Sequence, residues 1–135
     1  MQYSEKVLDH VRNPRHVGFI EDADGVGMVG DPSCGDFVVL TVRIRDGRIA
    51  DVQYQVRGCG AAIATCSVTT ELVLGQPLEV VGKLTDGDVV RALDGLPPEK
   101  LHCSNLAASA LHAALEDYRH RQKMNLHEWR SLYAR

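Results

Sequence analysis

The stretch from Val38 to Gly58, VVLTVRIRDGRIADVQYQVRG, decides the fold of this chain. In its first half, every second residue is apolar: Val38, Leu40, Val42 and Ile44. The positions between them hold Val39, Thr41, Arg43 and Arg45. A period of two indicates a strand with one buried face. Asp46-Gly47 follows, a pair typical of hairpin turns because both residues tolerate positive φ. The chain then returns with a second apolar series, which consists of Ile49, Val52, Tyr54 and Val56. The stretch therefore predicts an antiparallel hairpin.

The residues before the hairpin predict one helix and a long loop. Ser4 can cap a short amphipathic helix, which Asn13-Pro14 ends. Residues 18–35 are rich in Gly, Asp and Pro, which indicates a loop with a short strand near Met28-Val29. That strand would be the third of a small antiparallel sheet.

The residues after the hairpin predict helices. Residues 61–74 contain neither Gly nor Pro, and Gly75 provides a stop. Brief helices fit residues 78–84 and 88–93, and apolar residues recur at helical spacing from Ser104 to about residue 121. Strands followed by helices favour an α+β fold, in which the helices pack on one face of a three-stranded antiparallel sheet.

Composition excludes several classes of protein. The 135 residues are 44% hydrophobic and 24% charged, as in ordinary globular domains. No apolar run approaches the roughly 18–20 residues that span a bilayer, and the first residues resemble no secretion signal. A net charge of −3 argues against a nucleic-acid partner. We therefore expect a cytoplasmic protein with one domain over residues 1–135, in which residues 119–135 form a basic C-terminal helix or tail.

Four cysteines are more than such a chain needs for stability. In a reducing cytosol, thiols serve more often as metal ligands or reactive groups than as disulfides. Cys34 precedes the first long strand, Cys59 lies between the return strand and a helix, and Cys103 opens the long helix. A helix N-terminus stabilises negative charge, so we expect low thiol pKa values at Cys59 and Cys103. Cys66 lies inside a helical run, about 10 Å along the axis from Cys59, and is expected to be a buried thiol.

Three thiolates with one harder donor suit a metal site. Asp36 and His102 are the candidates for that donor, although a histidine beside a helix start is often only a capping or surface group. The set suits either Zn²⁺ or an iron–sulfur centre. No Cys-x-x-Cys pair is present, which argues against a zinc ribbon or a thioredoxin-type redox pair. Because a carboxylate binds cluster iron less firmly than a thiolate, such a site should release its cargo easily.

Five motifs, in order along the chain, resemble the IscU/NifU family of iron–sulfur cluster assembly scaffolds. They are YSEKV at residues 3–7, NPR at 13–15, SCGD at 33–36, GCGAAIA at 58–64 and LPPEKLHC at 96–103. Glu99 and the preceding Asp94-Gly95 resemble the N-terminal domain of NifU more than typical IscU. The resemblance implies a standalone scaffold domain that catalyses no turnover of a small substrate.

The resemblance also implies a ligand set and a cycle. Cys34, Cys59 and Cys103 would bind the cluster, Asp36 would keep it transferable, and His102 would be an alternative ligand. Cys103 would accept sulfur from the persulfide of a cysteine desulfurase. With Fe²⁺ and electrons, a transient [2Fe-2S] cluster would form and pass to apo-proteins; a cluster shared by two chains would make a homodimer.

Two positions depart from the family pattern. The family usually has a small hydroxyl residue where this chain has Cys66, so this thiol is either a spare sulfur acceptor or without a role. In IscU, the segment matching residues Leu96, Pro97, Pro98, Glu99 and Lys100 is recognised by an Hsp70-type chaperone with its co-chaperone, but with Val in place of Glu99. Here the two prolines serve either that contact or a rigid turn that places Cys103.

Two other functions remain open at this point. The first is a zinc-dependent sulfurtransferase of the SufU kind, but that group carries an insertion between its second and third cysteines, and the stretch after Cys59 follows the IscU/NifU pattern. The second is a structural zinc domain that binds a partner protein, which would not explain Asp36 beside Cys34.

Overall fold

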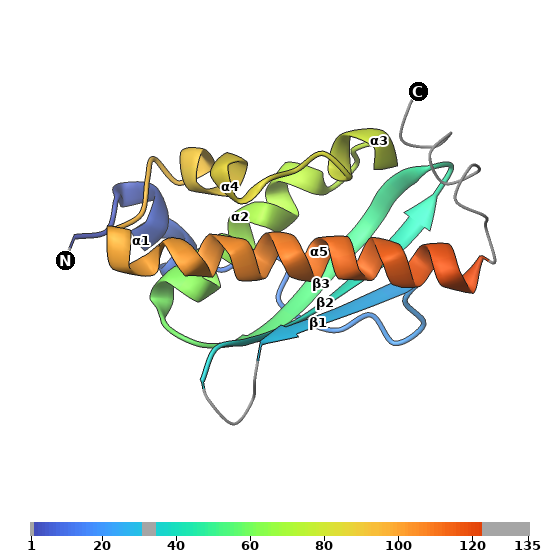
Figure 1. The fold of residues 1–135 in the computed structure, drawn as a ribbon, viewed down its shortest axis with the longest axis horizontal. Coiled ribbons are helices and arrows are strands. Elements are labelled where there is room, and N and C mark those ends of the chain that lie inside the picture. Colours follow the sequence, from blue (N-terminus) through green and yellow to red (C-terminus); the bar gives the residue numbers. More distant parts are fainter. Residues whose placement is uncertain (1, 31–34, 123–135) are drawn as a thin grey trace.

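The computed structural model describes residues 2–30 and 35–122, and in them the predicted three-stranded antiparallel sheet is confirmed (Figure 1). Its strands β1 (Gly25–Gly30), β2 (Phe37–Arg45) and β3 (Arg48–Arg57) lie in the order β1-β2-β3. At the hairpin, Arg45 pairs with Arg48, and Asp46 and Gly47 have φ values of 54° and 71°. The turn therefore needs positive φ at both central residues, as the Asp-Gly pair predicts.

The helices follow the predicted order with small shifts. They are α1 (Glu5–Arg12), α2 (Gly60–Val73), α3 (Leu78–Val81), α4 (Asp86–Ala92) and α5 (Leu101–Arg121), with a 3₁₀ turn η1 (Pro98–Lys100) before α5. The Ser4 hydroxyl caps α1 by accepting from the Val7 N–H at 3.1 Å. Beyond the end of α2, Gly75 has a φ of 81°, the left-handed conformation that glycine favours at a helix end.

The structure corrects the predicted start of the long helix. The chain is extended only up to Pro97, and Pro98 begins η1, so α5 starts at Leu101 instead of Ser104. Proline is compatible with the first position of a helix because it has no N–H, which would lack a partner there in any residue, and because its φ already suits the helix. Of the predicted C-terminal helix or tail, residues 119–121 form the last turn of α5, and residues 123–135 lie outside the described part.

Helices α2 and α5 cover one face of the sheet, with α5 running along β1 and β2 (Figure 1). Between these layers lies the main core, built largely from aliphatic side chains around one buried tyrosine, Tyr54. On the opposite face, the loop before β1 lies against the sheet, since the Ile20 N–H donates to Thr41 Oγ1 at 3.1 Å. No helix among the described residues is long and apolar enough to cross a membrane.

Two glycines of β1 let α5 lie directly on the sheet. A Cβ at Gly27 would be 2.0 Å from the Ala110 carbonyl oxygen, and one at Gly25 would be 2.2 Å from that of Ala114. These atoms belong to the helix backbone, which cannot move without moving the whole helix. The spacing of α5 from the sheet therefore depends on the absence of side chains at these positions.

We expect Gly27→Ala to lower the free energy of unfolding by at least about 2 kcal/mol, because the added methyl group must push α5 off β1. Denaturant unfolding measures the loss. The matched control is Gly87→Ala in α4, where the nearest atom to an added Cβ is 3.5 Å away. That change should leave stability equal or slightly higher, and equal stability of both variants would contradict the packing described here.

Candidate metal centre

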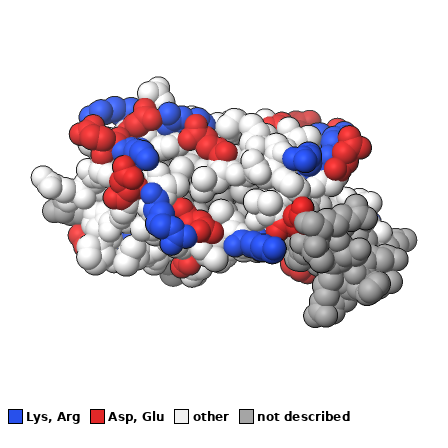
Figure 2. Space-filling view, turned by 90° about the horizontal axis from the view of Figure 1, so that it is seen from above, with Lys and Arg blue, Asp and Glu red and all other residues white. Residues whose placement is uncertain are grey.

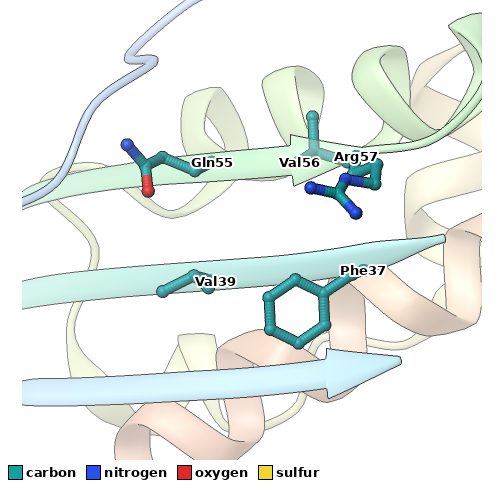
Figure 3. A pocket seen from close by; sticks show the side chains of 5 residues that line it. All are labelled: Phe37, Val39, Gln55, Val56 and Arg57. Carbon is teal, nitrogen blue, oxygen red and sulfur yellow. The ribbon is translucent and has the colours of Figure 1, made fainter. Parts of the chain in front are cut away.

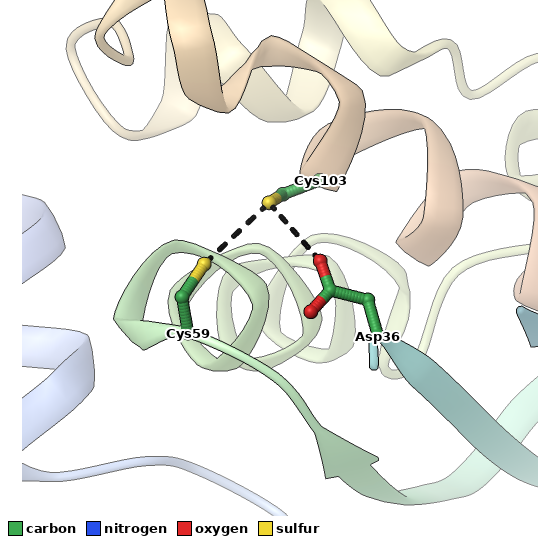
Figure 4. A group of neighbouring side chains, drawn as sticks. All are labelled: Asp36, Cys59 and Cys103. Atoms are coloured by element: carbon green, nitrogen blue, oxygen red, sulfur yellow. Dashed lines mark hydrogen bonds between the residues drawn. The ribbon is translucent and has the colours of Figure 1, made fainter. Parts of the chain in front are cut away.

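Asp36, Cys59 and Cys103 converge at one end of the sheet (Figure 4). One donor atom from each lies within 4.8 Å of the others. The Cys103 Sγ is 3.8 Å from the Cys59 Sγ and 4.0 Å from the Asp36 Oδ2. These distances are short enough for one metal ion to contact all three side chains after small rotamer changes.

Three different elements supply these donors. Asp36 immediately precedes β2, Cys59 is the N-cap residue of α2, and Cys103 lies in the first turn of α5. Because β2 starts where β3 ends, and α2 follows β3 directly, Asp36 and Cys59 meet at the same edge. Cys103 joins them because the N-terminal end of α5 reaches this edge. Cys34, the remaining predicted ligand, lies outside the described residues.

Gly58 provides the space in which the Asp36 carboxylate lies. A Cβ at Gly58 would be 2.7 Å from Asp36 Oδ1 and 2.9 Å from the Ala62 Cβ. At Gly60 the nearest atom would be 3.4 Å away, so the steric demand is far smaller there. Of the two glycines beside Cys59, Gly58 is therefore the one at which a side chain would displace the site.

The two thiols differ in acidity, which corrects the prediction of two low pKa values. At Cys59, burial alone would raise the pKa, but hydrogen bonds from the Ala62 N–H and the Cys103 thiol outweigh it and lower the pKa. Burial and the neighbouring Cys59 charge raise the pKa of Cys103 to about 12. Cys103 is 1% exposed, and this burial outweighs any benefit from the helix N-terminus.

His102 lies on the outer rim of the site. Its Nε2 is 3.4 Å from Asp36 Oδ2 and 3.7 Å from Cys103 Sγ, while 61% of its side chain is exposed. Both predicted alternatives for the fourth donor are thus close to Cys103. Asp36 belongs to the convergent group, and His102 would have to turn inward to join it.

Cys66 is buried, as predicted from its place inside a helix. The side chain of Cys66 is completely inaccessible to solvent and packs in the main core. Burial raises the pKa of its thiol to about 12. It does not belong to the group formed by Asp36, Cys59 and Cys103.

The segment predicted to bind a partner is only partly available at the surface. Pro98 and Glu99 are exposed, whereas Leu96 packs against two small apolar clusters. The negative charge of Cys59 raises the pKa of Lys100, which therefore belongs to the electrostatic surroundings of the site. Sequence reasoning missed this role, although Lys100 precedes Cys103 by three residues and thus lies about one helical turn away.

A separate hollow of about 280 Å³ lies beside this edge (Figure 3). It is lined by Phe37, Val39, Gln55, Val56 and Arg57. None of these five described residues carries a thiol, an imidazole or a carboxylate. On the face of the molecule seen in Figure 2, the described residues of both charges are interspersed around a broad neutral area and form no basic stripe.

The sequence of this chain is similar to the sequences of known proteins. The family described as NifU-like N terminal domain matches residues 2–125. Iron-sulfur cluster assembly scaffold protein IscU 1 of Archaeoglobus fulgidus is 54% identical over 116 residues, covering 86% of this chain and 76% of the relative. Iron-sulfur cluster assembly scaffold protein IscU of Escherichia coli K12 is 44% identical over 127 residues, covering 91% and 98%.

Solved structures share the fold. A scaffold protein for the SUF system, FiSufU of Fervidobacterium islandicum AW-1, superposes with a TM-score of 0.67 at 28% identity, covering 84% of this chain and 96% of that one. The N-terminal part of a NifU-like protein from Brucella abortus gives a TM-score of 0.72 at 17% identity, covering 87% and 94%, and supports the fold alone.

The pKa differences predict selective alkylation. At pH 8, iodoacetamide should modify Cys59 at least about tenfold faster than Cys103 or Cys66, because the thiolate is the reacting form and the other two thiols are buried with raised pKa values. Peptide mass spectrometry at several reaction times measures the three rates. In denaturant they should converge, and a Cys103 that reacts as fast as Cys59 in the folded protein would contradict this assignment.

Proposed function

The chain belongs to the family of NifU-like N-terminal domains, and we propose that it is a scaffold on which an iron–sulfur cluster is assembled and from which it is passed to acceptor proteins. The observation that carries the proposal is the convergence of Asp36, Cys59 and Cys103 at one edge of the sheet. The names of its relatives, at 54% and 44% identity, support the same function. No turnover of a small substrate is part of it, so the protein is a carrier rather than an enzyme.

The donor types suit a cargo that must leave again. Thiolates such as those of Cys59 and Cys103 bind iron firmly, whereas the Asp36 carboxylate is a weaker ligand for cluster iron. Asp36 is also about a quarter exposed, so solvent or an incoming ligand can compete for its place. In the full set we include Cys34 as the third thiolate and His102 as the alternative to Asp36.

The different burial of the two thiols, with Cys59 partly exposed and Cys103 buried, supports an order in which iron enters before sulfur. Fe²⁺ would first meet the Cys59 thiolate and the Asp36 carboxylate, and its positive charge would then release the proton of the adjacent Cys103. Cys103, now a thiolate, would attack the terminal sulfur of a desulfurase persulfide, forming a new persulfide as the desulfurase thiolate leaves. Each sulfur transferred this way needs two electrons to become sulfide, so an external electron donor completes a [2Fe-2S] cluster.

Partners follow from this scheme. A cysteine desulfurase supplies sulfur, and apo-proteins accept the cluster. Pro98 and Glu99 are exposed and could contact an Hsp70-type chaperone and its co-chaperone, although the inward placement of Leu96 leaves a short recognition segment. A cluster shared between two chains would also make the assembled form a homodimer.

The second candidate is a sulfur acceptor of the SufU kind that holds Zn²⁺ in the same site. The fold similarity to a SUF-system protein favours it, and the donor set accepts zinc as readily as iron. Identity to that protein is 28%, well below the identity to proteins named IscU. We therefore propose the cluster scaffold as the principal function, with zinc as a competing ligand.

Anaerobic reconstitution distinguishes the two candidates. The purified chain is stripped of metal and incubated with Fe²⁺, a cysteine desulfurase, cysteine and a reductant. We expect a visible [2Fe-2S] spectrum and transfer of the cluster to an apo-ferredoxin. Cys59→Ser, Cys103→Ser and Cys34→Ser should each prevent assembly, whereas Cys66→Ser should permit it; tightly held zinc with no cluster under any condition would overturn the scaffold.

Asp36→Ala tests the labile ligand. We expect a longer-lived cluster that transfers at least several-fold more slowly, because the imidazole of His102, 3.4 Å from Asp36, can take the vacated position and bind more firmly. Absorbance decay in the presence of apo-ferredoxin measures the transfer rate. Asp22→Ala, at an exposed position away from the site, is the control, and a variant at Asp36 that loses its cluster faster than the original chain would refute this role.

A further inference from the structure

The two described thiols of the site lie on different helices, so their spacing depends on how α2 and α5 are held together. Cys59 caps α2, and Cys103 lies in the first turn of α5. Near these residues the interface consists of small buried side chains, chiefly those of Ala61 and Ala62 against Cys103. Each of these small side chains buries little apolar area, so a polar contact across this interface contributes a larger share of what holds the helices in place.

Besides the contact between the two thiols, a hydrogen bond from Thr65 joins the helices at this point. The hydroxyl of Thr65 is completely buried, and its oxygen lies 3.3 Å from the carbonyl oxygen of Cys103 and 3.0 Å from that of Ala62. Both carbonyl oxygens therefore lie within hydrogen-bonding distance of the hydroxyl. Ala62 belongs to the first turn of α2, beside Cys59, so the hydroxyl connects the beginnings of both helices.

Thr69 shows how a buried threonine hydroxyl in α2 finds a hydrogen-bond acceptor within its own helix. Its hydroxyl is equally buried and donates to the Thr65 carbonyl at 2.6 Å, within the same helix. A bond to a carbonyl one turn earlier is the ordinary way to satisfy a helical threonine. Thr65 has such an acceptor in Ala62, yet its hydroxyl also reaches the backbone of Cys103 on α5.

We infer that Thr65 is a positioning residue, whose hydroxyl holds Cys59 and Cys103 at the spacing that the site requires. The inference rests on the proposed function, because only there must the two sulfurs act on one cargo. The group does not touch the cargo. It acts through the backbone of Cys103, and removing it should widen the range of Sγ–Sγ distances around the 3.8 Å seen here.

The test measures thiol proximity without iron or sulfide. In a chain with Cys34→Ser and Cys66→Ala, only Cys59 and Cys103 remain to react with dibromobimane. Mass spectrometry follows the first attachment, and fluorescence follows the second, intramolecular attachment, whose rate reports how often the sulfurs approach. Thr65→Val should slow the second step by about fivefold, the factor corresponding to one net hydrogen bond.

Thr69→Val is the matched control, because it removes a buried hydroxyl whose hydrogen bond lies within the same helix. It should lower the melting temperature about as much as Thr65→Val but leave the closing rate unchanged. Thr65→Ser, which keeps the hydroxyl, should close at the same rate as the chain with Thr65. Equal closing rates in the two valine variants, or a serine variant as slow as valine, would overturn the inference.

Alanine variants replace the valine variants if Thr65→Val does not fold. Thr65→Ala and Thr69→Ala are then compared in the same way, with the same outcomes deciding. Failure of the unsubstituted chain to assemble a cluster would refute the proposed function, but it would leave the closing rates, and hence the role of Thr65, to be decided separately.

Discussion

The close approach of α5 to β1 is the constraint on which the site depends. Gly25 and Gly27 leave no side chain between the strand and the backbone of the helix at Ala110 and Ala114. The helix can therefore run along the sheet in contact with β1 and β2 (Figure 1). Its first turn consequently ends beside the start of β2, which brings Cys103 to Asp36. A bulkier β1 would move the third donor away from the other two.

The electrostatics of the site follow from this convergence. A carboxylate and two thiols share a half-buried niche, where two adjacent thiolates would repel each other. The structure resolves this by lowering the pKa of Cys59 at the N-terminus of α2 and raising that of the buried Cys103. A bound cation would reverse the second effect, since positive charge stabilises the thiolate. The order of entry that we propose, iron before sulfur, is a consequence of this asymmetry.

Small and polar groups around the donors give the site its dimensions. Gly58 leaves room for the Asp36 carboxylate, and the Thr65 hydroxyl joins the beginnings of α2 and α5. Neither residue is a metal donor, and neither would be selected by a search for ligands in the sequence. Such residues decide whether donors that are present also lie at usable distances.

The sequence by itself determined what depends on near neighbours along the chain. The alternation in β2 and the Asp46-Gly47 turn predicted the hairpin, and the Gly-free run up to Gly75 predicted α2, because strand pleat, turn and helix end are local properties. Motif resemblance supplied the candidate donors. Only the tertiary structure decided that Cys103 has a raised pKa and that His102 stays at the rim. Burial and charge at a side chain depend on what distant segments pack against it, and no local pattern records those contacts.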